Sequence, residues 1–188
     1  EGVVCARLGD DGRETVLHRQ PEGKRGASRM PVVASPVVDE DRGVVFFCVN
    51  GDRETTLLAW SLRDERVAWS QQMPRFTVAT PALRSDGAIL VAGMDGAVRA
   101  FTAGGAPLFS YATGADYLLA GPVCDAAGTV FVGDPLGRLH AVDRGGGGRV
   151  FFEAPRSIQG RLAFDRQGHL HVACTDRTVR VFRNRLRA

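Results

Sequence analysis

The chain has 188 residues, a mass of 20.2 kDa, 44% hydrophobic residues and a formal net charge of +3, which suits one domain with a buried core. Its apolar runs are about four to six residues long, whereas a membrane-spanning helix needs roughly 20, so membrane insertion is excluded. The small net charge, spread over 24 cationic and 21 acidic residues, provides no basic surface for a nucleic acid.

An internal repeat of about 41 residues organises the chain. Residues 2–30 predict half a unit, because "GVVCARL" from Gly2 aligns with "GAVRAF" from Gly96. Full units follow at residues 33–75, 78–116 and 119–156, and a last incomplete unit covers residues 158–184. We interpret residues 1–188 as a single domain of about 4.5 such units.

Each full unit predicts four short antiparallel strands. Polar and apolar residues alternate along the strands, as at Val98, Arg99 and Ala100, which is the period of a half-buried strand. Glycine ends the turns, and the pairs Asp86-Gly87 and Asp95-Gly96 favour tight hairpins because glycine readily adopts a positive φ. With partial units at both ends, the pattern predicts 17 strands.

Four strands per unit at this period predict an all-β fold of β-propeller blades. A β-sandwich also has strands every 8 to 12 residues, but it does not need internal repetition. Because the chain opens and closes in mid-unit, we expect an arc of a larger propeller, which is either part of a longer chain or completed by a partner. A closed four-bladed ring is the alternative, and it requires the first and last strands to pair in one blade.

The repeat resembles the pyrroloquinoline-quinone-like, or quinoprotein-type, propeller repeats. The similarity rests on "ASPVVDEDRGVVFF" from Ala34, "GTVFVGDPLGRLHAVD" from Gly128 and "ERVAWSQQ" from Glu65, and it covers nearly the whole chain. It implies one of three uses: a quinone-dependent dehydrogenase, a non-catalytic binding subunit of a larger complex, or a module attached to a sensor or enzyme.

The residues that the family's enzymes need are not evident. Those enzymes have a tryptophan beside the quinone and commonly a vicinal disulfide, but this chain has no Cys-Cys pair, and Trp60 and Trp69 lie inside predicted strands. His169 and His171 would share one strand face but have no evident third ligand for a metal. We therefore predict no catalytic, cofactor-binding or metal-binding residues and lean against an enzyme.

The loops that depart most from the repeat are the candidate contact points for a protein partner, because a propeller presents loops on a rigid ring. They are residues 21–31, 50–56 and 113–121. Tyrosine and arginine are enriched in binding hot spots. The predicted partner-binding residues are Arg25, Arg29, Arg53, Tyr117 and Leu118.

The sequence thus predicts a non-catalytic scaffold or assembly subunit that binds protein. The alternative is part of a quinoprotein-like enzyme or sensor whose propeller binds a small ligand near its axis. The four cysteines form no closely spaced pair, so we expect single buried thiols, which favour a reducing, cytoplasmic compartment. The sequence does not identify the partner, the oligomeric state or the full number of blades.

Overall fold

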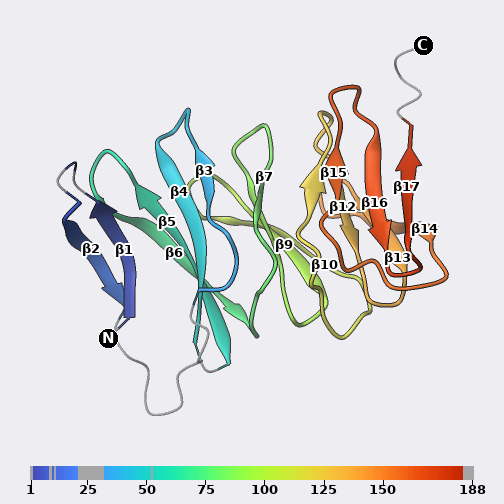
Figure 1. The fold of residues 1–188 in the computed structure, drawn as a ribbon, viewed down its shortest axis with the longest axis horizontal. Helices are drawn as coiled ribbons and strands as arrows, with labels where there is room; N and C mark the ends of the chain where they lie inside the picture. The colour runs from blue at the N-terminus through green and yellow to red at the C-terminus, as the bar shows by residue number, and fades with distance from the viewer. Residues whose placement is uncertain (1, 9, 11, 21–31, 52, 184–188) are drawn as a thin grey trace.

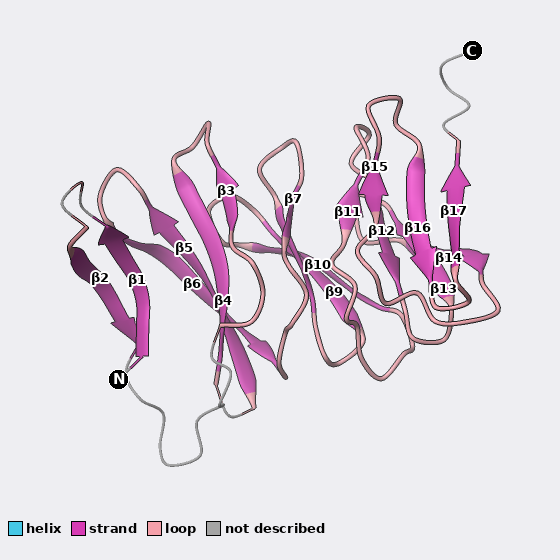
Figure 2. Ribbon diagram, viewed as in Figure 1, coloured by secondary structure: helices cyan, strands magenta, loops and turns pink. Residues whose placement is uncertain are grey.

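The computed structural model describes residues 2–8, 10, 12–20, 32–51 and 53–183. Every regular element within these residues is a β-strand (Figure 2). The strands form five antiparallel sheets that follow one another along an open arc (Figure 1). Over the same residues, no helix has the length and apolar character needed to cross a membrane.

The sheets follow the order of the chain. The first contains β1 (Gly2–Leu8) and β2 (Glu14–Gln20). The second contains β3 (Val37–Asp39), β4 (Val44–Asn50), β5 (Glu54–Ser61) and β6 (Arg66–Pro74). The third contains β7 (Ala82–Leu83), β8 (Ile89–Ala92), β9 (Ala97–Phe101) and β10 (Pro107–Ala112). The fourth contains β11 (Val123–Cys124), β12 (Val130–Gly133), β13 (Arg138–Val142) and β14 (Gly148–Glu153). The fifth contains β15 (Ala163–Phe164), β16 (Leu170–Cys174) and β17 (Thr178–Phe182).

These 17 strands agree with the number expected from the repeat, counted over the described residues. In each full sheet the four strands pair in sequence order. The short first strands β3, β7 and β11 contact one another from sheet to sheet, so they lie on the inner side of the arc. The fourth strands β6, β10 and β14 lie at the opposite edge of their sheets.

The hydrophobic core is divided among the junctions between successive sheets. At one junction Leu90 and Val98, from the β7–β10 sheet, pack against Val130 and Val142 from the β11–β14 sheet, and all four are fully buried. Period-two alternation explains this arrangement, because each strand presents one set of apolar side chains to the preceding sheet and the other set to the following sheet. The junctions therefore hold the arc together.

The outermost strands lock neighbouring sheets through aromatic side chains that cover glycines. Trp69 on β6 lies over Gly105, where an added Cβ would stand 2.6 Å from the indole ring, and its Nε1–H donates to the carbonyl oxygen of Ala103 over 2.8 Å. Phe109 on β10 covers Gly146 in the same way. The glycines of the "RGGGGR" turn between β13 and β14 thus leave room for the aromatic residues of the preceding sheet.

The two ends of the arc are incomplete sheets that lie apart (Figure 1). β1 is paired with β2, and the last sheet contains β15, β16 and β17. Among the described strands the first and last do not share a sheet, so the closed four-bladed ring is wrong for this structure. The expected open arc is what the strands form.

The cysteines whose side chains the structure describes, Cys48, Cys124 and Cys174, are unpaired. Cys48 is 1% exposed, and burial raises its pKa to about 12. Burial likewise raises the pKa of Cys124 to about 12. All three are single thiols, as expected; Cys48 and Cys174 are also buried, as expected, whereas Cys124 is only half-buried.

We expect Cys48 to resist alkylation in the folded protein. A pKa near 12 leaves so little thiolate at pH 8 that reaction with iodoacetamide should be about a thousandfold slower than for an ordinary thiol. Peptide mapping by mass spectrometry, with and without urea, measures the two rates. Equal rates in the native and unfolded protein would contradict the burial of this side chain.

Candidate functional site

The turns between the second and third strands lie beside the segments that link successive sheets. Backbone hydrogen bonds join them: the N–H of Met94 donates to the carbonyl oxygen of Phe76 over 2.8 Å, and the N–H of Leu118 donates to that of Gly93 over 3.1 Å. We call the rim of the arc that carries these turns and linking segments the linker end. It lies opposite the β3–β4 and β7–β8 turns, which are at the top of Figure 1.

Two of the five residues predicted to contact a partner reach the surface at the linker end. Arg53 is exposed in the turn between β4 and β5, and Tyr117 is half-buried in the segment between β10 and β11. The two therefore belong to loops of different sheets. Arg25 and Arg29 lie outside the described residues.

Leu118 does not reach the surface, which corrects the expectation that it contacts a partner. Its side chain is fully buried and packs in the junction that also contains Leu90 and Val130. The linking segment must cross between two sheets, and an apolar side chain fills the gap there. Ile158 occupies the same place one repeat later and is also fully buried. Aligning the two linking segments in the sequence would have shown an apolar residue at both positions, which indicates that Leu118 packs inside a junction.

Two exposed apolar side chains at the linker end were missed by the sequence reasoning. Phe76 is 37% exposed in the segment after β6, and Leu136 is 63% exposed in the turn between β12 and β13. The repeat did indicate that Leu136 is exposed, because the aligned turn positions of the two neighbouring sheets hold the charged residues Asp95 and Asp176. We define the linker-end surface as Arg53, Phe76, Tyr117 and Leu136.

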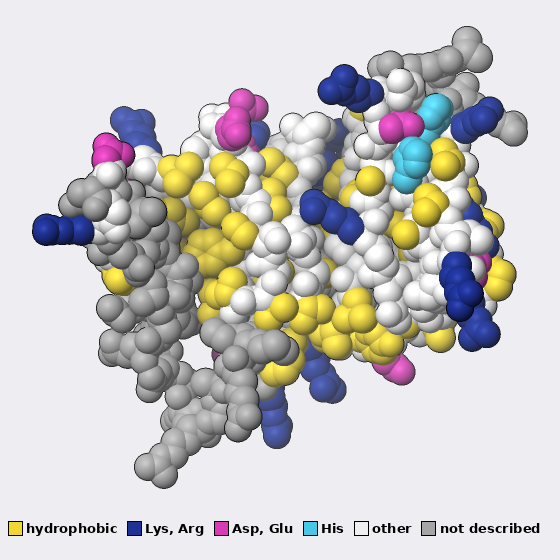
Figure 3. All heavy atoms as spheres, viewed as in Figure 1, with side chains coloured by type: hydrophobic (Ala, Val, Ile, Leu, Met, Phe, Trp, Pro, Cys, Tyr) yellow, Lys and Arg dark blue, Asp and Glu magenta, His cyan; other side chains and the backbone are white. Residues whose placement is uncertain are grey.

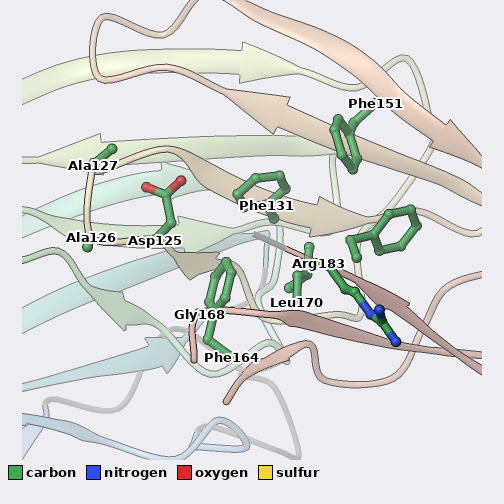
Figure 4. Close-up of a pocket in the computed structure, with 10 residues that line it drawn as sticks. Asp125, Ala126, Ala127, Phe131, Phe151, Phe164, Gly168, Leu170 and Arg183 are labelled. Atoms are coloured by element: carbon green, nitrogen blue, oxygen red, sulfur yellow. The ribbon is translucent and has the colours of Figure 1, made fainter. Parts of the chain in front are cut away.

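A pocket of about 290 Å³ opens between the β11–β14 and β15–β17 sheets (Figure 4). The ring of Phe131 lies 5.7 Å from that of Phe151 and 5.8 Å from that of Phe164, between centroids. Asp125 lies toward one end of the pocket and Arg183 toward the other. Aromatic walls with few polar groups suit an apolar or aromatic group. Sequence reasoning missed the pocket because its walls come from two sheets.

A buried polar network crosses the junction between the third and fourth sheets. Asp134 and His140 are 0% and 1% exposed. The Arg138 Nε–H donates to Asp134 Oδ2 over 2.7 Å, and His140 Nε2 lies 3.0 Å from the same oxygen. The other ring nitrogen of His140 lies 3.0 Å from the hydroxyl of Tyr111, on β10 of the preceding sheet. The network therefore ties two sheets together.

Hydrogen bonds set the charge state of Asp134. Burial raises its pKa, but the hydrogen bonds from His140 and from the backbone and side chain of Arg138 outweigh burial, so the pKa lies below its ordinary value. Asp134 is therefore a carboxylate at neutral pH. It acts as the charged centre of the network.

His169 and His171, the predicted pair, are held by one carboxylate on the surface. Nδ1 of His169 and Nε2 of His171 each lie 3.0 Å from Oδ2 of Asp165, and Figure 3 shows histidines (cyan) beside an acidic side chain. These contacts hold the pKa of Asp165 well below its usual range, with the hydrogen bond from His171 as the largest cause. Across the described part of the chain, His, Cys, Asp and Glu form no group of three or more that could hold a metal ion.

Comparisons with known proteins bear on the fold. No family model and no curated protein matches the chain. The solved structure of BamB from Moraxella catarrhalis is similar, with a TM-score of 0.65 and 21% identity, over 80% of this chain and 49% of BamB. The computationally designed Ika4 protein is also similar, with a TM-score of 0.66 and 17% identity, over 87% of this chain and 95% of Ika4.

The match to BamB spans about half of that protein. At these identities the likeness concerns the fold, and it agrees with the predicted all-β architecture of four-stranded antiparallel sheets. The chain is an arc of β-propeller blades built from propeller repeats.

Proposed function

We propose that this propeller arc is a non-catalytic protein-interaction module, a scaffold or assembly subunit, that contacts a protein partner through the linker-end surface. The observation that carries the proposal is that two apolar side chains and an arginine are exposed in the loops of the linker end. Leu136 is 63% exposed and Phe76 is 37% exposed. Arg53 is exposed in the β4–β5 turn, which is the counterpart, in the second sheet, of the turn that holds Leu136.

The physical support is the rigidity of the loops. The turns at the linker end are pinned to the linking segments by backbone hydrogen bonds, such as that from Ile158 N–H to the carbonyl oxygen of Asp134 over 3.0 Å. Exposed side chains on such turns lose little entropy on binding. Aromatic residues and arginine are also the side chains that contribute most to protein interfaces.

Photo-crosslinking tests the proposal directly. A benzophenone amino acid in place of Leu136 should capture a discrete protein in extracts of the source cells. The same group in place of Leu108, which is 45% exposed on the outer strand β10, is the matched control and should capture none. Equal capture at both positions, or none at either, would refute the assignment of this surface.

Substitutions should then weaken the captured complex. Arg53→Glu combined with Leu136→Glu should lower the affinity for that partner at least about tenfold, because hot-spot residues contribute about 2 kcal/mol or more each. Both side chains are exposed, so the melting temperature should remain close to that of the wild type. Surface plasmon resonance measures the affinity, and Leu108→Glu is the control. An unchanged affinity in the double variant counts against the linker end.

A small-ligand role is the second candidate function, and the aromatic pocket of Figure 4 favours it. Phe131, Phe151 and Phe164 form apolar walls, which would accommodate a flat aromatic ligand. Pyrroloquinoline quinone with Ca²⁺ is the probe for this role, read as a shift in melting temperature. A substantial stabilisation that is abolished by Phe151→Asp would move the assignment to ligand binding.

A further inference from the structure

The aspartates in the linker-end turns of the last three sheets are neutralised locally. Each pairs with an arginine four residues further along the chain, on the third strand of its own sheet: Asp95 with Arg99, Asp134 with Arg138 and Asp176 with Arg180. The negative charge of each turn is therefore balanced within that turn.

The other arginines of this rim have no such counterion. Five exposed arginines lie in its turns and linking segments: Arg53, Arg75, Arg156, Arg161 and Arg177. Three exposed acids lie in these loops or at the adjoining strand ends: Glu54, Asp116 and Glu153. None of the eight forms an ion pair with another described residue. The described part of the rim therefore carries an excess of positive charge, and Figure 3 shows cationic side chains (dark blue) projecting from it at the bottom of the view.

Two of these arginines adjoin each other and an exposed aromatic ring. The N–H of Arg75 donates to the carbonyl oxygen of Arg53 over 2.9 Å, so two exposed cationic side chains start from neighbouring backbone. Phe76, 37% exposed, follows Arg75 directly. We call Arg53, Arg75 and Phe76 the first cluster. Like charges on facing residues are unfavourable, and a bound carboxylate would relieve that repulsion.

A second cluster of the same kind lies further along the rim. The carbonyl oxygen of Arg156 would stand 2.7 Å from a Cβ added to Gly137, so Arg156 adjoins the turn that holds Leu136, which is 63% exposed. The same carbonyl oxygen accepts a hydrogen bond from Cys174 Sγ over 3.0 Å, and the N–H of Arg177 donates to the carbonyl oxygen of Cys174 over 3.2 Å. Leu136, Arg156 and Arg177 form this second cluster. Each cluster thus combines two arginines without counterions and one exposed apolar side chain.

The backbone of two of these arginines is strained. Arg75 and Arg177 have φ of +63° and +68°, in the left-handed region that residues other than glycine avoid. The position of Arg177 is occupied in the two preceding sheets by glycines with positive φ, Gly96 and Gly137. An arginine here costs conformational free energy that glycine would not. Such strain is found preferentially at binding sites.

We propose, on the basis of the proposed function, that the linker-end surface recognises an acidic segment of its protein partner. The carboxylates of that segment pair with the arginines of the two clusters, and its apolar side chains cover Phe76 and Leu136. Arginine suits this role because its planar guanidinium binds a carboxylate through two hydrogen bonds. A nucleic acid fits the rim less well, since the exposed side chains of Leu136 and Asp116 offer nothing to a phosphate backbone.

Binding of a defined acidic peptide tests the proposal. The probe is a fluorescein-labelled peptide of about twelve residues that repeats Asp-Asp-Leu, and the neutral control peptide repeats Asn-Asn-Leu. We expect the full chain to bind the acidic peptide, with an affinity that falls as the salt concentration rises from about 0.05 to 0.5 M, and to bind the neutral peptide much more weakly. Fluorescence anisotropy measures both affinities.

Charge reversal in the first cluster should weaken this binding. Arg53→Glu combined with Arg75→Glu should lower the affinity for the acidic peptide at least about tenfold, because two attractive contacts become repulsive. The matched control is Arg63→Glu combined with Arg66→Glu. These two arginines are also exposed, but they adjoin the β5–β6 turn at the opposite rim, so this variant should bind like the wild type.

Arg177→Gly separates binding from folding. Glycine adopts the φ of +68° at this position without strain, so the melting temperature should stay unchanged or rise. The affinity for the acidic peptide should nevertheless fall at least about threefold. A variant that binds the peptide as the wild type does would exclude Arg177 from the site, and a lower melting temperature would assign it a structural role.

Three outcomes overturn the inference: no binding of the acidic peptide by the wild type, equal binding by the Arg53 and Arg75 double variant, or tighter binding of oligodeoxythymidine than of the peptide. The last would assign the rim to a nucleic acid. Failure of the proposed function has a different signature. If the photo-crosslinker at position 136 captures a protein but that complex is insensitive to salt, the interaction module stands and the acidic segment does not. If the crosslinker captures nothing, both fail.

Discussion

Asp134→Ala is expected to destabilise the protein by about 3 kcal/mol or more, because removing one partner of a buried charged network leaves the others unpaired. Asp134 is 0% exposed. Its carboxylate accepts hydrogen bonds from the Arg138 side chain and from the backbone N–H groups of Leu136 and Arg138, each over 2.7 to 2.9 Å. His140, 1% exposed, would also lose its carboxylate partner. Urea unfolding measures the change in free energy.

The matched control is Asp143→Ala. Asp143 caps its turn in a similar way, accepting hydrogen bonds from the N–H groups of Gly145 and Gly147 over 2.8 and 2.9 Å, but it is exposed. Its removal should lower the free energy of unfolding by about 1 kcal/mol or less. If the two variants lose the same free energy, the network is not a major contribution to stability.

Acid should weaken the same network. The pKa of Asp134 is lowered in the folded protein, so the unfolded chain binds the proton more readily. The contribution of this carboxylate is complete above the ordinary aspartate pKa of about 3.9, and it is lost as pH falls through the lower pKa of the folded state. We expect the free energy of unfolding to decrease as the pH is lowered beneath about 4. Asp134→Asn should make this decrease with pH less steep. An unchanged slope in Asp134→Asn would contradict the assignment.

The repeat predicted the strands well, because alternation and turn glycines are local signals. The glycines of the predicted turns, Gly87, Gly96, Gly128 and Gly168, all have φ between +72° and +86°. The linking segments carry no such period, and whether one of their side chains is buried depends on the two sheets between which the segment crosses. Leu118 was therefore assigned to the surface although it fills a junction.

The site was less predictable than the fold, because its residues come from separate repeat units. Phe76 and Leu136 lie in loops of different sheets, and no local pattern indicates that they share the linker end. The Asp134 network was missed for a related reason. Its hydroxyl partner, Tyr111, stands 29 positions away from His140 on another sheet, so spacing along the chain gave no sign of the contact.

Gly96→Ala is the second substitution for which we expect a large effect, a loss of about 2 to 4 kcal/mol. Gly96 has a φ of +72°, and a Cβ at this position would stand 1.7 Å from the carbonyl oxygen of Ala115. That segment cannot easily move away, because the N–H and the hydroxyl of Thr113 both donate to the carbonyl oxygen of Gly96, over 3.0 and 2.8 Å. Overpacking then adds to the backbone strain.

Gly43→Ala separates the two effects. Gly43 also has a positive φ, of +62°, but an added Cβ would meet no atom within 4 Å. This variant should therefore lose only the conformational contribution, about 1 kcal/mol, in the same urea titration. A larger loss for Gly96→Ala than for Gly43→Ala would show that the repeat keeps this glycine for the close approach of the linking segment. Equal losses of unfolding free energy in the two variants would mean that the positive φ alone requires glycine at position 96.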